Sequence, residues 1–219
     1  MIRTALVALT AFATLGNARP QTPGILITPV LDNATVGVNR LRMEAESGES
    51  VHTHPFGLLV VLLTDADVER TLAGKTNRTH ETAGSVWFAP KDVPHASRNT
   101  GKAPIEAIAV AVKPDRPSAP SAPATAAPPG ITRTTILDND DMRVVRVTFT
   151  TDGREPVHTH PNDLLTIQLT SGRVEMSIGS EKTMSGRGAG FIQFVPRNVP
   201  HAYASADTKP FEILSVAIK

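Results

Sequence analysis

The chain has 219 residues, enough for one large domain or two small ones. Its 22 basic and 21 acidic side chains leave a formal net charge of +1, which gives no electrostatic basis for binding nucleic acid or an anionic membrane surface. There is no cysteine, which excludes disulfides, iron–sulfur clusters and cysteine nucleophiles. The fold must therefore be held together by its core, or by its core and a metal.

Residues 1–18 have the features of a secretory signal peptide. Arg3 precedes an uncharged, mostly apolar run, and Gly16 and Ala18 place small residues where a signal peptidase cleaves. The run is shorter than the roughly 20 residues that span a bilayer, although a retained N-terminal anchor is the alternative. We predict an exported protein, periplasmic or extracellular, with no membrane span after cleavage and a short N-terminal arm over residues 19–27.

The rest of the chain repeats itself. The segment Val-His-Thr-His-Pro at 51–55 returns at 157–161, and Val-Pro-His-Ala at 93–96 returns at 199–202. Both pairs are offset by 106 residues, and no gap is needed between them. The sequence is therefore a tandem duplication.

A stretch rich in proline, alanine and serine, residues 114–130, separates the two copies and predicts an extended linker. It is long enough that the domains, 28–113 and 131–219, need not pack tightly. Each copy contains short aliphatic and β-branched runs, such as 57–64 and 163–170, and helical periodicity is not sustained. The predicted fold class is all-β, with one small sandwich or jelly-roll barrel per copy.

Six of the seven histidines form two matched sets. Successive side chains of a strand point to opposite faces, so the two members of a His-x-His pair share a face, and the third histidine follows 41 residues later in both copies. A lone histidine is more often a packed core residue, but this duplicated pattern favours a metal site. The predicted ligands are His52, His54 and His95, and His158, His160 and His201.

The residues around the third histidine resemble the second motif of the cupin superfamily, and the two copies together resemble a bicupin. The matching residues are Gly84, Pro90, His95 and Asn99 in the first copy, and Gly190, Pro196 and His201 in the second. Asp92 and Asn198 replace the family's central glycine, and both residue types tolerate a left-handed turn.

The family's glutamate ligand is replaced by Leu58 and Leu164, so the resemblance is to small three-histidine cupins without this carboxylate. It implies two tandem cupin jelly-roll barrels joined by the linker. The implied cofactor is a divalent transition metal, Fe(II) first, with Mn, Ni, Zn and Cu open because imidazole does not choose among them.

Three neutral imidazoles leave the charge of a divalent ion uncompensated, which predicts a small anionic or chelating ligand. The implied activity is that of a three-histidine non-haem dioxygenase. A non-catalytic module that binds or senses a metal or small anion is the alternative, and a metal-dependent isomerase is a third. Because a fused pair of barrels can satisfy a cupin dimer interface within one chain, either a monomer or a homodimer is expected.

Strand alternation predicts further site residues. Beyond Leu164, the positions on the histidine face are Thr166 and Gln168, whereas the first copy has Val60 and Leu62 there. We therefore expect Thr166 and Gln168 to contact substrate in the C-terminal barrel, with Gln168 as a hydrogen-bonding group or weak fourth ligand. A β-bulge would reverse this parity.

Two further pairs of charged residues occupy equivalent positions. Arg40 and Arg146 are candidates for holding a carboxylate substrate, with a solvated or structural role as the alternative. Glu49 and Glu155 lie an odd number of residues from the His-x-His pair, which predicts an outward, solvated position for both.

Overall fold

A computed structural model describes residues 22–119 and 126–219 of the chain. The predicted signal peptide, the first three residues of the predicted N-terminal arm and residues 120–125 of the linker lie outside these residues. Within them the structure is all-β, with sixteen strands in four antiparallel sheets. No helix in the described ranges is long and apolar enough to cross a membrane.

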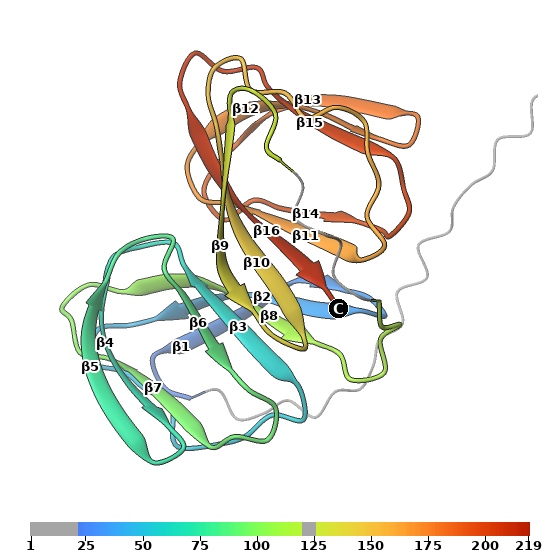
Figure 1. The fold of residues 1–219 in the computed structure, drawn as a ribbon. Coiled ribbons are helices and arrows are strands. Elements are labelled where there is room, and N and C mark those ends of the chain that lie inside the picture. Colours follow the sequence, from blue (N-terminus) through green and yellow to red (C-terminus); the bar gives the residue numbers. More distant parts are fainter. Residues whose placement is uncertain (1–21, 120–125) are drawn as a thin grey trace, which may run out of the picture.

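The first copy forms barrel 1, which pairs a five-stranded sheet, ordered β1-β2-β8-β3-β6, with a three-stranded sheet, ordered β5-β4-β7 (Figure 1). Its first strand begins within the segment predicted as an arm. The strands are β1 (Ile25–Asp32), β2 (Val36–Met43), β3 (Gly57–Leu62), β4 (Ala66–Leu72), β5 (Lys75–Glu81), β6 (Val86–Ala89), β7 (His95–Asn99) and β8 (Ile105–Val112).

The second copy forms barrel 2, with the same sheet orders at equivalent strands, β9-β10-β16-β11-β14 and β13-β12-β15. The strands are β9 (Ile131–Asp138), β10 (Met142–Phe149), β11 (Asp163–Gln168), β12 (Gly172–Ile178), β13 (Glu181–Arg187), β14 (Ile192–Val195), β15 (His201–Ser205) and β16 (Phe211–Ile218).

The two barrels share one hydrophobic core, formed where their five-stranded sheets face each other (Figure 1). Seven buried residues come from each copy, and the two sets correspond at the same offset of 106. They are Val36, Val38, Leu59, Val61, Ile108, Val110 and Val112, and Met142, Val144, Leu165, Ile167, Leu214, Val216 and Ile218. Alternate residues of the same strands face the barrel interiors, which form two smaller core clusters.

Polar contacts across this interface are also duplicated. Arg40 donates a hydrogen bond to the carbonyl of Gly190 (3.4 Å), and the equivalent Arg146 donates to the carbonyl of Gly84 (2.9 Å). Such reciprocal contacts are those of a two-fold symmetric dimer, here joined into one chain. The expectation that the barrels need not pack tightly is therefore wrong.

The first part of the linker lies against barrel 2. Arg116 bonds to the carboxylate of Asp141 (2.9 Å) and the carbonyl of Lys219 (2.7 Å), and Asn162 donates to the carbonyl of Ala119 (2.9 Å). This part has no regular secondary structure, as its composition predicts, but its contacts fix it in place rather than leave it as a free tether.

Candidate metal centres

Backbone pairing brings the three histidines of barrel 1 together. His52 and His95 form a β-bridge and exchange N–H···O bonds of 2.9 Å in both directions. The carbonyl of His54 accepts from the N–H of Asp92 (2.8 Å), whose φ of 58° is the left-handed conformation predicted at this position. We call this group triad 1; its third histidine lies beside the first, because β7 begins at the bridge.

The hydrogen bonds of triad 1 set the tautomers of two rings. His52 Nδ1 lies 2.8 Å from the carbonyl oxygen of Ser50, and His95 Nδ1 lies 2.8 Å from that of Val93. A carbonyl can only accept, so both Nδ1 atoms carry the proton and both Nε2 atoms present a lone pair. His52 Nε2 lies 3.0 Å from His54 Nε2, and His95 Nε2 is buried without a hydrogen-bond partner.

Triad 2, formed by His158, His160 and His201, repeats this geometry in barrel 2. His158 Nδ1 donates to the carbonyl of Pro156 (2.8 Å) and His201 Nδ1 to that of Val199 (2.9 Å), while the Nε2 atoms of His158 and His160 are 3.0 Å apart. Burial, followed by the neighbouring histidines and Arg133, lowers the pKa of His160 to about 4. The ring is therefore neutral at pH 7, as metal ligation requires.

Both triads fit a divalent transition metal. In each, the ligand nitrogens lie within 4.8 Å of one another, and two of the three rings are partly exposed while the third is buried. Nδ1–H bonds to backbone carbonyls are the contacts that orient metal-binding histidines in proteins. Among the described residues no carboxylate completes either group, so ligand positions on such an ion would remain open to water or substrate.

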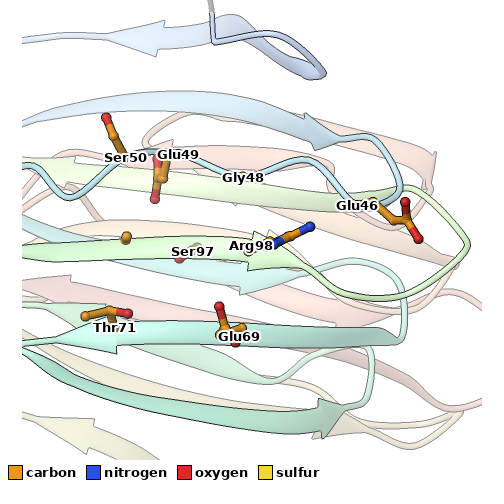
Figure 2. Close-up of a pocket in the computed structure, with 9 residues that line it drawn as sticks. Glu46, Gly48, Glu49, Ser50, Glu69, Thr71, Ser97 and Arg98 are labelled. Atoms are coloured by element: carbon orange, nitrogen blue, oxygen red, sulfur yellow. The ribbon is translucent and has the colours of Figure 1, made fainter.

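Barrel 1 also places an acidic side chain beside its triad. Glu49 Oε2 lies 3.9 Å from His52 Nε2, the nitrogen that faces the triad, and burial raises the Glu49 pKa although His52 and His95 oppose this. Glu49 borders a hollow of about 340 Å³ and lies between its own loop and the strand of Ser97 (Figure 2). The expectation of an outward, solvated Glu49 is wrong, because residues 49–51 are not a regular strand and alternation does not hold there.

The equivalent carboxylate in barrel 2 is held differently. Glu155 forms an ion pair with Arg133, and its side chain is largely buried, so the expectation of a solvated Glu155 is also wrong. Arg133 corresponds to Ile27 in barrel 1, where no such partner exists. The two equivalent glutamates therefore have different partners: Glu155 is ion-paired with Arg133 in barrel 2, whereas Glu49 lies near His52 in barrel 1.

The predicted lumen residues of barrel 2 do face the interior. The pairing of β11 with β14 and β16 runs without a bulge, and Leu165 and Ile167 face the shared core, so Thr166 and Gln168 face the opposite side. The Thr166 hydroxyl lies 2.9 Å from the Tyr203 hydroxyl, and both residues are buried.

Gln168 does not lie at the triad. It is four residues beyond Leu164 on β11, about 13 Å at the usual strand rise, and its amide donates to the carbonyl of Thr170 (2.9 Å). Nor do Arg40 and Arg146 reach either triad, since both lie on the outer face of their sheets, between the barrels. A fourth-ligand role for Gln168 and a substrate role for the two arginines are therefore revised.

The side chains around the triads differ in character. In barrel 1, Phe56 stacks on His54 with ring centroids 4.9 Å apart, and Trp87 meets His95 edge-on at 5.7 Å. Barrel 2 has Asn162 and Gln193 at these positions. Triad 1 therefore has aromatic neighbours that triad 2 lacks.

Comparisons with known proteins agree with this architecture. A scan of protein families matches residues 145–217 to the Cupin domain. The chain has the fold of a bicupin, with two tandem cupin barrels. AerE from Microcystis aeruginosa is similar in structure, with a TM-score of 0.73 at 13% identity, covering 90% of this chain and 93% of that one. A search of curated proteins by sequence found no match.

Two further solved structures share the fold of the bicupin. A putative glyoxylate-induced protein from Pseudomonas aeruginosa has a TM-score of 0.73 at 17% identity, covering 92% of this chain and 83% of that one. A salicylate 1,2-dioxygenase from Pseudaminobacter salicylatoxidans has a TM-score of 0.71 at 10% identity, covering 90% and 77%. At these identities the likeness shows the fold alone.

Sequence reasoning missed several residues around the sites of the bicupin. Tyr203 lies two positions after His201 on one strand, so alternation along β15 was a signal that could have found it. Phe56 follows His54 by two residues and was open to the same argument.

Proposed function

We propose that this bicupin is an exported, metal-dependent enzyme that acts on a small, chelating organic anion as a three-histidine non-haem dioxygenase. The observation that carries the proposal is the convergence of Nε2 lone pairs in both triads, fixed by Nδ1–H bonds to backbone carbonyls. Dioxygenases among proteins of the same fold, one of them crystallised with gentisate, support this class.

His52, His54 and His95 would hold one ion and His158, His160 and His201 another, with Fe(II) as the first candidate. When bound, the ion supplies a Lewis-acid and redox centre at which a chelating anion and dioxygen can react. The histidines remain neutral and keep ligand positions open. Since they supply no negative charge, an anionic substrate is favoured over a neutral one.

We assign the reaction to barrel 1, in place of the expectation that substrate contacts Thr166 and Gln168 in the C-terminal barrel. Its lumen-facing residues Leu58 and Val60 are partly exposed, whereas the equivalent Leu164 and Thr166 are buried and Tyr203 packs among them. The aromatic neighbours Phe56 and Trp87 favour a planar substrate at triad 1. Triad 2, in the closed lumen, would bind metal without turning over this substrate. Barrel 2 would then be a non-catalytic metal-binding module, the alternative function considered above for the whole protein.

The test combines metal analysis with oxygen uptake. Protein purified without chelators is compared with the variants His52→Ala/His54→Ala and His158→Ala/His160→Ala, each assayed with Fe(II) and gentisate, a β-diketone or a thiol. We expect about two equivalents of one transition metal in the wild type and one in each variant, with oxygen uptake lost only in the first variant. Metal without oxygen uptake would support a binding module, and no metal after reconstitution would refute the proposal.

A further inference from the structure

Arg187, at the end of β13, is a buried cation without a counter-ion. Its side chain is 4% exposed, and its hydrogen bonds go to neutral acceptors: the Tyr203 hydroxyl (3.0 Å), the Ser185 hydroxyl (3.3 Å) and the Met176 sulfur (3.4 Å). The guanidinium also lies over the Phe191 ring, 4.6 Å from its centroid. No carboxylate in the described ranges forms an ion pair with Arg187. A charge buried this way is costly unless an anion joins it.

In barrel 1 the charge at the position equivalent to Arg187 is neutralised by an ion pair. Glu81 is the counterpart of Arg187, and it forms an ion pair with Arg70 on the neighbouring strand. The counterpart of Arg70 is Met176, the residue whose sulfur contacts Arg187. Barrel 1 thus has an acid and a base at these two positions, whereas barrel 2 has a base alone.

The charge difference extends to the surface around Arg187. Arg173 stands where barrel 1 has Asp67, Ser171 where it has Asp65, and Lys209 where it has Ala103. Neither Arg173 nor Lys209 forms an ion pair within the described residues. At these three positions barrel 1 has two acidic side chains, whereas barrel 2 has two basic ones.

These basic residues line one hollow of about 690 Å³ at the end of barrel 2, which we call the basic hollow. Its single acidic side chain, Asp207, already accepts hydrogen bonds from the backbone N–H groups of Arg173 and Thr208. Met184 adds an apolar surface, since it lines the hollow and is 56% exposed. The hollow combines a buried arginine in its lining, a cationic rim and an apolar wall.

We infer that the basic hollow binds a small organic carboxylate, with Arg187 as its anchoring residue. The guanidinium is held in place by Tyr203, Ser185 and Phe191, so little side-chain freedom is lost when an anion binds. Arg173 and Lys209 add long-range attraction at the rim, and Met184 packs against the carbon skeleton of the ligand. This site is separate from both triads and needs no metal.

Titration calorimetry with benzoate, acetate and inorganic phosphate tests the site in the full chain. We expect benzoate to bind more tightly than acetate because of the apolar wall, and Arg187→Gln to weaken benzoate binding by on the order of 10- to 100-fold. Arg154→Gln, an exposed arginine on the same barrel outside the hollow, is the matched control and should bind as the wild type does. Phosphate binding tighter than benzoate would overturn the carboxylate assignment.

A second variant tests the site even if Arg187→Gln does not fold. Arg173→Gln/Lys209→Ala changes only exposed side chains and should weaken binding severalfold, with a smaller dependence on salt. His158→Ala/His160→Ala should leave benzoate binding unchanged although triad 2 loses its metal, which separates this site from the metal centre of the same barrel. Unchanged binding in the rim variant and in a folded Arg187→Gln protein, or loss of binding in the histidine variant, would overturn the inference.

Discussion

Barrel 1 and barrel 2 share three things at a constant offset: the strand order, the histidine geometry and the face that packs against the other barrel. They differ in the side chains between these features: Trp87 and Glu81 of barrel 1 correspond to Gln193 and Arg187 of barrel 2. The shared features each depend on several residues at once, as an interface or a ligand set does. The lumen and the barrel ends are constrained less by the fold, so they can differ and take up different ligands.

The largest effect is expected from the feature that the barrels share. Leu59 and Leu165 are equivalent and fully buried in the common core. Substituting either by alanine should lower the free energy of unfolding by about 2–5 kcal/mol, because it removes buried methyl groups and leaves a cavity. Denaturant titration followed by tryptophan fluorescence and circular dichroism measures the loss.

If the interface is symmetric, the two substitutions should cost similar amounts and keep both barrels in one cooperative transition. Leu26→Ala, at an exposed position on β1, is the control and should change the unfolding free energy by less than about 0.5 kcal/mol. A loss in one variant but not in its counterpart would show that the barrels do not stabilise each other equally.

Much of the shared architecture could be predicted from the sequence, because the signals are local and occur twice. The His-x-His pair and the third histidine fix their own geometry through short-range pairing, and Asp92 and Asn198 occupy left-handed turns as predicted. Strand parity at Thr166 was also predictable, since β11 has no bulge. Because the two copies correspond at every motif, a prediction made for one barrel applies to the other.

The sequence-based predictions failed where a residue's role depends on the other barrel or on irregular backbone. Arg40 and Arg146 are candidate substrate ligands in the sequence, because nothing local shows that their face of the sheet is covered by a second sheet. Glu49 was placed outside because alternation was extended past the point where the strand pattern ends. Arg187 is a candidate binding residue because no carboxylate in the described ranges pairs with it. Only the three-dimensional structure shows that this ion pair is absent.

The next prediction compares the two buried arginines. Arg70→Met should lower the unfolding free energy by on the order of 2–4 kcal/mol, because it leaves Glu81 buried without its cation. Arg187→Met should change it by less than about 1 kcal/mol in a buffer free of carboxylate and phosphate, since it removes a cation that has no counter-ion. Thermal and denaturant unfolding of both variants make the comparison, and equal losses would contradict the difference between the barrels.

The smallest effect is expected at the paired glutamates. Glu49 lies beside the triad-facing nitrogen of His52, where its negative charge would favour a bound cation, whereas Glu155 is engaged by Arg133. Glu49→Gln keeps the shape but removes the charge, so it should weaken metal binding at triad 1 by about tenfold, within the range for groups that contact metal ligands. Glu155→Gln should weaken binding at triad 2 less. Competition with a chromophoric chelator measures both, with the other triad removed by its paired alanine variant. Equal losses would mean that the ion pair with Arg133 leaves Glu155 as available to its site as Glu49 is.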